Sequence, residues 1–125
     1  MFRLSTKKMI SAAHVLRDYD GPCARLHGHN WNIKLDVLSD APNNIGITVD
    51  FLDLDKILWD VIGPFDHNNF NDFPPFDTIN PSAENVAKYF YDEIKKKLPP
   101  GIKIDKISIW ETEQYLVEYF ENDKK

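Results

Sequence analysis

The sequence predicts an α+β fold in which an antiparallel four-stranded sheet carries two helices on one face. Two strand-like segments open the chain, two helix-like segments follow, and two strand-like segments close it. Strands joined by loops pair antiparallel, and amphipathic helices bury their apolar sides against a sheet. Residues 1–125 form one domain in this prediction, because they contain no internal repeat and no linker-like composition.

The first strand is predicted over residues 2–14, where apolar side chains and Thr6 recur at every second position. Lys8 is the only interruption of that pattern. A loop rich in turn formers follows at residues 17–25, and a second alternating run covers residues 30–40. An antiparallel pairing of the two runs places the end of the first beside the start of the second.

The first helix is predicted over residues 54–62, where Leu, Ile and Val recur at helical spacing and a Gly-Pro pair follows. A short extended run is expected just before it, at residues 46–51. Asp50 or Asp53 is the candidate N-cap, because a carboxylate there accepts hydrogen bonds from free backbone N–H groups.

Residues 65–81 are predicted to be irregular, since Asn, Asp and Pro are frequent there. The second helix begins after an N-cap at Ser82 and continues to a Pro-Pro-Gly turn. Strands are then expected over residues 102–112 and 115–120, and residues 121–125 are expected to form a polar tail.

Composition narrows the class of protein. The net charge of −5 and the pI of about 5.3 argue against nucleic-acid binding, which needs a basic surface. No apolar run approaches the roughly 20 residues of a membrane span, and the N-terminus lacks the apolar core of a signal peptide. One cysteine cannot form an internal disulfide and fits a reducing compartment. We therefore expect a cytoplasmic protein that binds neither nucleic acid nor membrane.

The densest group of reactive side chains lies in residues 23–31, Cys-Ala-Arg-Leu-His-Gly-His-Asn-Trp. His27 and His29 point to the same face of an extended backbone, so both can reach one ion. An isolated His-x-His pair is equally consistent with ordinary surface or hydrogen-bonded histidines. His14, at the end of the first predicted strand, is the natural third ligand. Three protein ligands with one open position is the arrangement of a catalytic zinc site.

Several short motifs together resemble the 6-pyruvoyltetrahydropterin synthase superfamily. Within it, the chain is most similar to the 6-carboxytetrahydropterin synthases of 7-deazaguanine (queuosine) biosynthesis. The resemblance covers nearly the whole chain, and several weak motifs in one order are more specific than any single motif. The matching segments, in family order, are Ala12–His14, Cys23 with His27 and His29, Gly46–Phe51, Asp66-His67, Asn80–Asn85 and Glu111-Thr112.

The spacing of these motifs distinguishes the branches of the superfamily. Three residues, 24–26, separate Cys23 from the His-Gly-His triplet, as in the carboxy-type enzymes, whereas the animal pyruvoyl-type enzymes have a longer insert. Relatives that produce a hydroxymethylpterin have a Glu before the triplet or in place of the cysteine, and this chain has Leu26 and Cys23. Ser82 stands where the family usually has Thr, so a hydroxyl is retained.

The resemblance implies that His14, His27 and His29 bind Zn²⁺, which acts as a Lewis acid on the side-chain hydroxyls of the substrate. It also implies that Cys23 is the general base that moves a substrate proton. The alternative for an isolated cysteine is an inert buried thiol.

The resemblance implies further roles outside this motif. Asp66 and His67 would form an acid/base pair in which Asp66 orients the imidazole. Glu111 would anchor the pterin by accepting hydrogen bonds from its N–H groups, and Thr112 and Ser82 would assist in binding the substrate.

Each of these roles has a simpler alternative. Glu111 can be an exposed charge on a strand, and Asp66-His67 can cap a loop rich in Asn and Asp. Glu84 is a substrate-binding candidate by its place in the family motif, and it is also an ordinary first-turn acid of a helix.

The implied reaction converts 7,8-dihydroneopterin triphosphate into 6-carboxytetrahydropterin, acetaldehyde and triphosphate. The implied architecture is the tunnelling fold (T-fold), whose members form trimers that stack into hexamers with active sites at subunit interfaces. We therefore expect a homo-oligomer. Candidate cations for the triphosphate, chosen only by position, are Lys7, Lys8, Arg17 and Arg25.

Two alternatives to this function remain open at the level of sequence. The first is a sister activity with a pyruvoyl or hydroxymethyl product. The second is a non-catalytic pterin- or purine-binding protein, against which the retained Cys23, Asp66 and His67 argue, because binding needs only Glu111 and aromatic walls.

Overall fold

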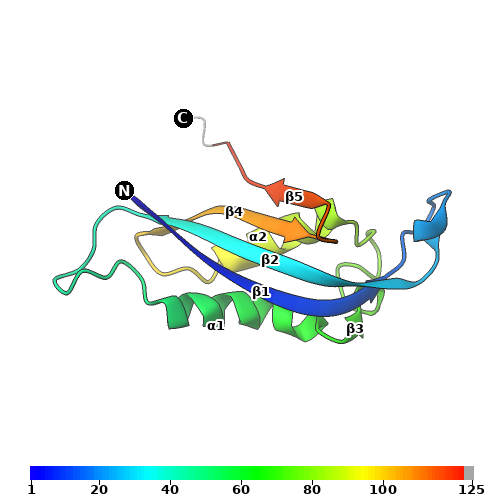
Figure 1. The fold of residues 1–125 in the computed structure, drawn as a ribbon, viewed down its shortest axis with the longest axis horizontal. Helices are drawn as coiled ribbons and strands as arrows, with labels where there is room; N and C mark the ends of the chain where they lie inside the picture. The colour runs from blue at the N-terminus through cyan, green and yellow to red at the C-terminus, as the bar shows by residue number, and fades with distance from the viewer. Residues whose placement is uncertain (123–125) are drawn as a thin grey trace.

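A twisted five-stranded sheet and two α-helices that cover one of its faces make up the computed structural model (Figure 1), which describes residues 1–122. The strand order is β3-β1-β2-β4-β5. The α+β class and the placement of both helices on one face are confirmed. The end of the predicted polar tail, residues 123–125, lies outside the described residues.

The longest strands are β1 (Phe2–His14) and β2 (His27–Ser39), which pair antiparallel along their full lengths. Their alternating side chains explain this pairing, because one face of each strand is buried against the helices. On that face of β2, the side chains of Trp31, Ile33 and Leu35 are completely buried. The register pairs His14 with His27, so the pairing brings these two histidines together.

The interruption of the pattern at Lys8 has a tertiary explanation. Lys8 Nζ lies 3.5 Å from Asp55 Oδ2 on helix α1 (Phe51–Ile62). The hydroxyl of Thr6 donates to the same carboxylate. Asp55 therefore allows a lysine to occupy the helix-facing side of β1.

A fifth strand corrects the predicted sheet of four antiparallel strands. β3 (Asn68–Asn69) pairs parallel with Ala12 and Ala13 at the edge of β1, which makes the sheet mixed. A strand of two asparagines carries no alternation of apolar and polar residues. Its pairing is therefore a consequence of where the loop is held in space.

The other edge of the sheet is formed by β4 (Ile102–Trp110) and β5 (Leu116–Tyr119), both antiparallel to their neighbours. Asp105 is an extra residue in β4, and it produces a β-bulge opposite Asp36 and Val37 of β2. The predicted strands extended one or two residues beyond the observed ends.

Both helix starts follow from local capping. Asp50 accepts from the backbone N–H of Leu52 at 2.9 Å at the start of α1. Ser82 Oγ accepts from the backbone N–H of Asn85 at 3.1 Å at the start of α2 (Ala83–Lys95). The residues before α1, predicted as extended, instead form turns, and α2 ends before the Leu98 that the apolar pattern had included.

The segment between the helices is irregular as predicted, but it contributes to the core. It contains two short 3₁₀ turns, η2 (Gly63–Phe65) and η3 (Phe70–Asp72). Phe65, Phe70 and Phe76 are buried there and contact one another edge-on or stacked. These aromatic anchors hold the segment against the ends of β1 and β2. Among residues 1–122, no helix has the length and apolar character needed to cross a membrane.

Candidate metal centre and its surroundings

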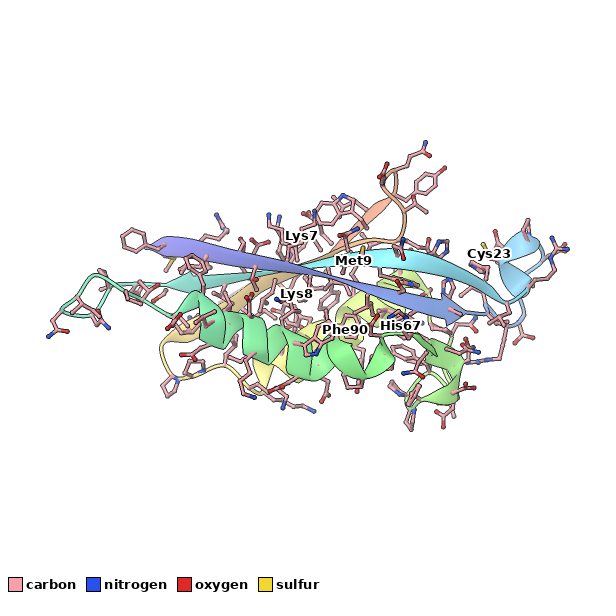
Figure 2. The ribbon with its side chains drawn as sticks, turned by 60° about the horizontal axis from the view of Figure 1, so that its bottom comes forward. Lys7, Lys8, Met9, Cys23, His67 and Phe90 are labelled. Atoms are coloured by element: carbon pink, nitrogen blue, oxygen red, sulfur yellow. The ribbon has the colours of Figure 1, made fainter. Side chains whose placement is uncertain are left out.

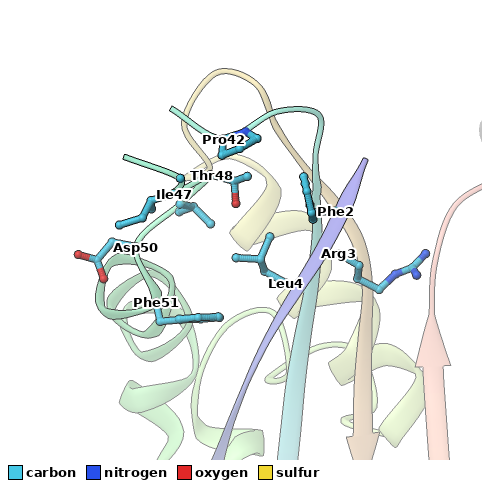
Figure 3. A pocket seen from close by; sticks show the side chains of 10 residues that line it. Phe2, Arg3, Leu4, Pro42, Ile47, Thr48, Asp50 and Phe51 are labelled. Carbon is cyan, nitrogen blue, oxygen red and sulfur yellow. The ribbon is translucent and has the colours of Figure 1, made fainter. Parts of the chain in front are cut away.

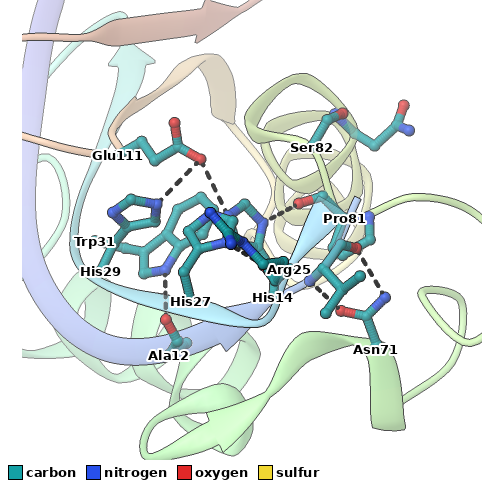
Figure 4. Close-up of polar contacts among 12 residues, drawn as sticks. Ala12, His14, Arg25, His27, His29, Trp31, Asn71, Pro81, Ser82 and Glu111 are labelled. Carbon is teal, nitrogen blue, oxygen red and sulfur yellow. Dashed lines mark hydrogen bonds and ion pairs between the residues drawn. The ribbon is translucent and has the colours of Figure 1, made fainter. Parts of the chain in front are cut away.

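Three histidines meet where β1 ends and β2 begins. His14 is the last residue of β1, His27 is the first of β2, and His29 follows on the same face of β2. The three side chains offer ligand atoms that all lie within 4.8 Å of one another. Figure 4 shows the three histidines gathered beneath Glu111. The structure therefore brings together the three histidines that the sequence predicts as a metal site.

His14 is held in one tautomer by its surroundings. Its Nδ1 lies 2.7 Å from the carbonyl oxygen of Pro81, which can only accept a hydrogen bond, so Nδ1 carries the proton. Burial is the main cause that lowers the pKa of His14 to about 4; His27 and His29 contribute to the lowering, and the hydrogen bond to Pro81 opposes it. The ring is therefore neutral at pH 7. Its Nε2 is buried and has no hydrogen-bond partner among residues 1–122. A buried lone pair of this kind costs free energy unless a cation occupies the position in front of it.

Of the other two imidazoles, His27 is oriented by a backbone carbonyl as His14 is, and His29 is affected by burial. His27 Nδ1 lies 2.7 Å from the carbonyl oxygen of Arg25, so its Nε2 is the free lone pair. Burial lowers the pKa of His29, an effect that the nearby Glu111 carboxylate partly opposes. Neutral imidazoles with free lone pairs are the form that binds metal.

Glu111 lies over the histidine cluster. Its Oε2 is 3.3 Å from His14 Nε2 and 3.7 Å from His29 Nε2 (Figure 4). A carboxylate facing the lone pair of a neutral imidazole is repelled unless a proton or cation lies among them. The donor set therefore fits a divalent cation. The simpler reading of Glu111 as an exposed charge is wrong, since only 27% of its side chain is exposed.

Trp31 supports the cluster from the core side, a role that the sequence analysis did not assign. Its ring contacts His14 and His29 edge-on, with centroid distances of 5.0 and 5.7 Å. Its Nε1 donates to the carbonyl of Ala12 at 3.1 Å. The available signal was its spacing, two residues beyond His29 on the same face of a strand.

Cys23 is separated from the predicted acid/base pair within one chain. It lies in the 3₁₀ turn η1 (Pro22–Ala24), on the loop beyond the ends of β1 and β2, whereas His67 lies beside the edge of β1 (Figure 2). A groove of about 550 Å³ contains His67 together with His29, and Cys23 does not line it. Cys23 as a residue is partly exposed, which argues against the alternative of a buried inert thiol.

Asp66 and His67 do not form a hydrogen-bonded pair. Their side chains approach to 3.8 Å between Oδ2 and Nε2, which is too long for a hydrogen bond. The other carboxylate oxygen of Asp66 accepts from the backbone N–H of Ser11 at 2.9 Å, and the His67 N–H donates to the Ser11 carbonyl at 2.6 Å. Asp66 thus hydrogen-bonds the loop to β1. This agrees with the alternative in which Asp66-His67 caps the loop. His67 has a φ of 60°, and its side chain is 80% exposed.

The other predicted substrate-binding residues have local roles in this chain. Ser82 Oγ is the cap of α2, and Thr112 Oγ1 accepts from the backbone N–H groups of Gln114 and Tyr115, each at 3.2 Å. Glu84 is exposed in the first turn of α2. Within residues 1–122, none of the three is hydrogen-bonded to the histidine cluster.

The basic side chains that are candidates to bind the substrate triphosphate differ in the contacts that they already make within the chain. The Arg17 guanidinium donates to the carbonyls of Phe76 and Ile79, at 3.0 and 2.8 Å. Lys8 is paired with Asp55, and Lys7 Nζ lies 4.5 Å from the centroid of the Trp110 ring. Arg17 is therefore a structural residue in this chain.

Comparison with known proteins identifies the family that this chain resembles along nearly its whole length. The sequence model of a family described as 6-pyruvoyl tetrahydropterin synthase matches residues 3–122. The chain is 31% identical over 116 residues to the dihydroneopterin monophosphate aldolase of Pyrococcus furiosus, a match that covers 93% of this chain and 95% of that enzyme. It is 35% identical over 102 residues to the 6-carboxy-5,6,7,8-tetrahydropterin synthase of Bacillus subtilis, covering 78% of this chain and 68% of that enzyme.

A solved structure shows the same fold. The 6-pyruvoyl tetrahydropterin synthase of Caenorhabditis elegans superposes with a TM-score of 0.87 at 26% identity, covering 97% of this chain and 96% of that one. The three relatives carry the names of three different pterin enzymes. The fold is therefore shared among proteins that are named for different reactions.

Proposed function

The chain belongs to the 6-pyruvoyl tetrahydropterin synthase family, and we propose that it is a zinc-dependent 6-carboxytetrahydropterin synthase. The substrate is 7,8-dihydroneopterin triphosphate, and the products are 6-carboxytetrahydropterin, acetaldehyde and triphosphate. The observation that carries the proposal is the cluster of His14, His27 and His29, whose ligand atoms lie within 4.8 Å of one another. The similarity to the Bacillus subtilis enzyme supports the choice of reaction.

Zinc is proposed because of the chemistry of the donors. Three imidazole nitrogens with an open fourth position are the ligand set of catalytic zinc, and imidazole is a poor ligand for Mg²⁺ or Ca²⁺. The ion supplies Lewis-acid polarisation of the substrate hydroxyls when it is bound. The chain itself contributes rigid placement, since two of the three imidazoles are fixed by backbone carbonyls.

The proton-transfer roles remain as the sequence suggested. Cys23 is proposed as the base that removes a side-chain proton from the substrate, and His67 as the group that exchanges a proton with solvent or substrate. Asp66 is proposed to fix the loop that carries His67, because its carboxylate accepts from the Ser11 N–H. Glu111 is proposed to accept the pterin N–H groups, assisted by Thr112, Ser82 and Glu84.

A homo-oligomer, a trimer or hexamer, is part of the proposal. Cys23 and His67 do not share a groove in one chain, although the reaction needs both beside the substrate. A second copy that supplies one of them completes the site. The product is proposed to enter 7-deazaguanine (queuosine) biosynthesis in the cytoplasm.

An aldolase-type reaction that yields a hydroxymethylpterin is the second candidate function. The Pyrococcus furiosus relative, named as a dihydroneopterin monophosphate aldolase, matches more of this chain than the Bacillus subtilis enzyme does. Cys23 and Leu26 argue for the carboxy-type reaction, because the hydroxymethyl-producing branch has a Glu at or near these positions. A pyruvoyl-type product is the remaining sister activity.

Product identification separates these functions. Zinc-loaded protein is incubated with 7,8-dihydroneopterin triphosphate, beside a Cys23→Ala control, and the products are identified by mass spectrometry. We expect 6-carboxytetrahydropterin from the parent protein and none from the control. A pyruvoyl or hydroxymethyl product would assign the chain to a sister activity. Unchanged substrate, with saturable pterin binding and a confirmed zinc content, would support a non-catalytic pterin-binding protein.

A further inference from the structure

We propose that Asn71 and Asn80 are positioning residues that keep His14 in the tautomer able to bind metal. Both belong to the segment that follows β3, and neither touches the cluster. They hold the chain on either side of the contact between His14 and Pro81. This inference rests on the proposed metal-binding function and names the residues that prepare one of its ligands.

The side chains of the two asparagines make the hydrogen bonds that a neighbouring strand would make with the residues after β1. Asn71 accepts from the backbone N–H of Val15 at 2.8 Å and donates to its carbonyl at 3.0 Å (Figure 4). Asn80 likewise accepts from the backbone N–H of Arg17 and donates to its carbonyl, both at 2.8 Å. Val15 and Arg17 follow directly after β1, where its pairing with β2 and β3 has ended. Two side-chain amides thus hydrogen-bond both backbone groups of alternate residues, as a neighbouring strand does.

Asn71 and Asn80, together called the clamp below, are anchored to helix α2. Asn85 Nδ2 donates to the carbonyl of Asn80 at 2.9 Å, and the Asn85 N–H is bound by the Ser82 cap of α2. Pro81, between Asn80 and Ser82, is buried. Its carbonyl is therefore held in a fixed position relative to the start of α2, 2.7 Å from His14 Nδ1.

The position of this carbonyl decides between two states of His14. Glu111 Oε2 lies 3.3 Å from His14 Nε2, so a proton on Nε2 would be attracted to that carboxylate. In that tautomer the Nε2 lone pair is lost and the ring cannot bind a metal through it. The Pro81 carbonyl favours the proton on Nδ1, which leaves Nε2 free. Loosening the clamp shifts the balance toward the contact with Glu111.

Asn43 offers a matched control. Its Oδ1 accepts from the backbone N–H groups of Ile45 and Ile47, both at 3.0 Å. Asn43 lies in the loop after β2, and the register places that end of β2 farthest from His27. Its removal deletes two backbone contacts of the same kind without touching the clamp.

The test combines a readout that needs no metal with one that measures it. The variants are Asn71→Ala, Asn80→Ala, Asn80→Asp and Asn43→Ala, and urea unfolding identifies conditions in which each is folded. Nitrogen-15 NMR of the metal-free proteins reports the tautomer of His14, assigned with a His14→Gln variant. Competition with a chelator gives the zinc dissociation constant.

We expect the parent and Asn43→Ala to show the proton on Nδ1 and to bind zinc equally well. Asn80→Ala should populate the form protonated on Nε2 and bind zinc about 10- to 100-fold more weakly, the usual effect of losing support behind a ligand. Asn71→Ala should change both readouts in the same direction. Asn80→Asp keeps the acceptor for the Arg17 N–H and should fall between parent and Asn80→Ala.

The inference is overturned if both alanine variants keep the proton on Nδ1 and the zinc affinity of the parent. It is also overturned if Asn43→Ala weakens zinc binding as much as Asn80→Ala. Failure of the proposed function has a different signature: the tautomer and affinity shifts occur as expected, but the zinc-loaded parent produces no 6-carboxytetrahydropterin.

Discussion

The two ends of the β1–β2 pair differ in how their polar groups are satisfied. At the histidine end, His14 Nε2 is buried beneath a carboxylate and has no hydrogen-bond partner in the part of the chain that the structure describes. At the opposite end, a pocket of about 400 Å³ is lined mainly by apolar side chains (Figure 3). Its two charged residues already have partners, since Arg3 pairs with Asp105 at 2.7 Å and Asp50 caps α1.

The comparison shows that the presence of a pocket does not by itself locate the chemistry, since the groove at the histidine end has a volume of about 550 Å³ and the apolar pocket one of about 400 Å³. The charged residues of the apolar pocket are engaged with other groups, whereas the histidine end brings three imidazole ligand atoms within 4.8 Å of one another. A buried lone pair without a partner is costly in the metal-free protein, so its retention indicates a ligand. Ligand chemistry is therefore expected at the histidine end, and the following experiments test that difference.

The largest effect is expected from Cys23. Cys23→Ala should lower turnover by about 10²- to 10⁴-fold, the usual contribution of a general base, while zinc affinity stays unchanged because Cys23 is not a ligand. Steady-state kinetics and chelator competition measure the two quantities. Turnover equal to that of the parent would remove Cys23 from the proposed mechanism.

The pH dependence of stability should report the burial of His14. Its pKa is lowered in the folded state from 6.5 to about 4, so the unfolded chain binds a proton that the folded chain does not. Stability of the metal-free protein should therefore fall as the pH decreases from 6.5 toward 4, by up to about 3 kcal/mol. His14→Gln should lack this component in urea unfolding at several pH values. An identical pH profile for both proteins would contradict the prediction.

Glu111 should show two separable effects. Glu111→Gln removes a charge-assisted acceptor for the pterin and should lower kcat/KM by about 10- to 100-fold. It also removes the carboxylate that faces neutral imidazoles, so the metal-free protein should not lose stability. Kinetics and urea unfolding test these statements separately. A strongly destabilised variant would show that Glu111 is mainly structural.

The smallest effect is expected at the apolar pocket. Phe51 lines it and is 58% exposed, so Phe51→Ala should cost about 1 kcal/mol or less of stability. Zinc affinity should not change, because no polar group of that end contributes to the cluster. Chelator competition is the measurement, and weaker zinc binding by Phe51→Ala would mean that the two ends are coupled.

Local patterns predicted most of the fold. Alternation along residues 2–14 predicted β1 with its observed bounds, and local sequence predicted Ser82 as one helix cap and Asp50 or Asp53 as the other, of which the structure uses Asp50. The joining of His14 to His27 followed from antiparallel pairing alone. These features depend on neighbours along the chain or on one strand pair, which a single sequence displays directly.

Other features depend on segments that are distant in sequence. Asn68 and Asn69 form a strand only because buried phenylalanines hold their loop at the edge of β1. The same loop contains Asn71, which is hydrogen-bonded to the backbone of Val15, 56 residues away in the sequence. No local pattern distinguishes these asparagines from those in an ordinary turn.

The sequence by itself determined the order of the four antiparallel strands and two helices and identified the three histidines, because periodicity and spacing are properties of the chain. Only the tertiary structure decided which lone pairs are free, since the tautomer of His14 is set by the Pro81 carbonyl and opposed by Glu111. It also decided that Asp66 binds the backbone of β1 and that Cys23 stands apart from His67. Hydrogen bonds act over about 3 Å, and only the folded chain brings such partners within that distance.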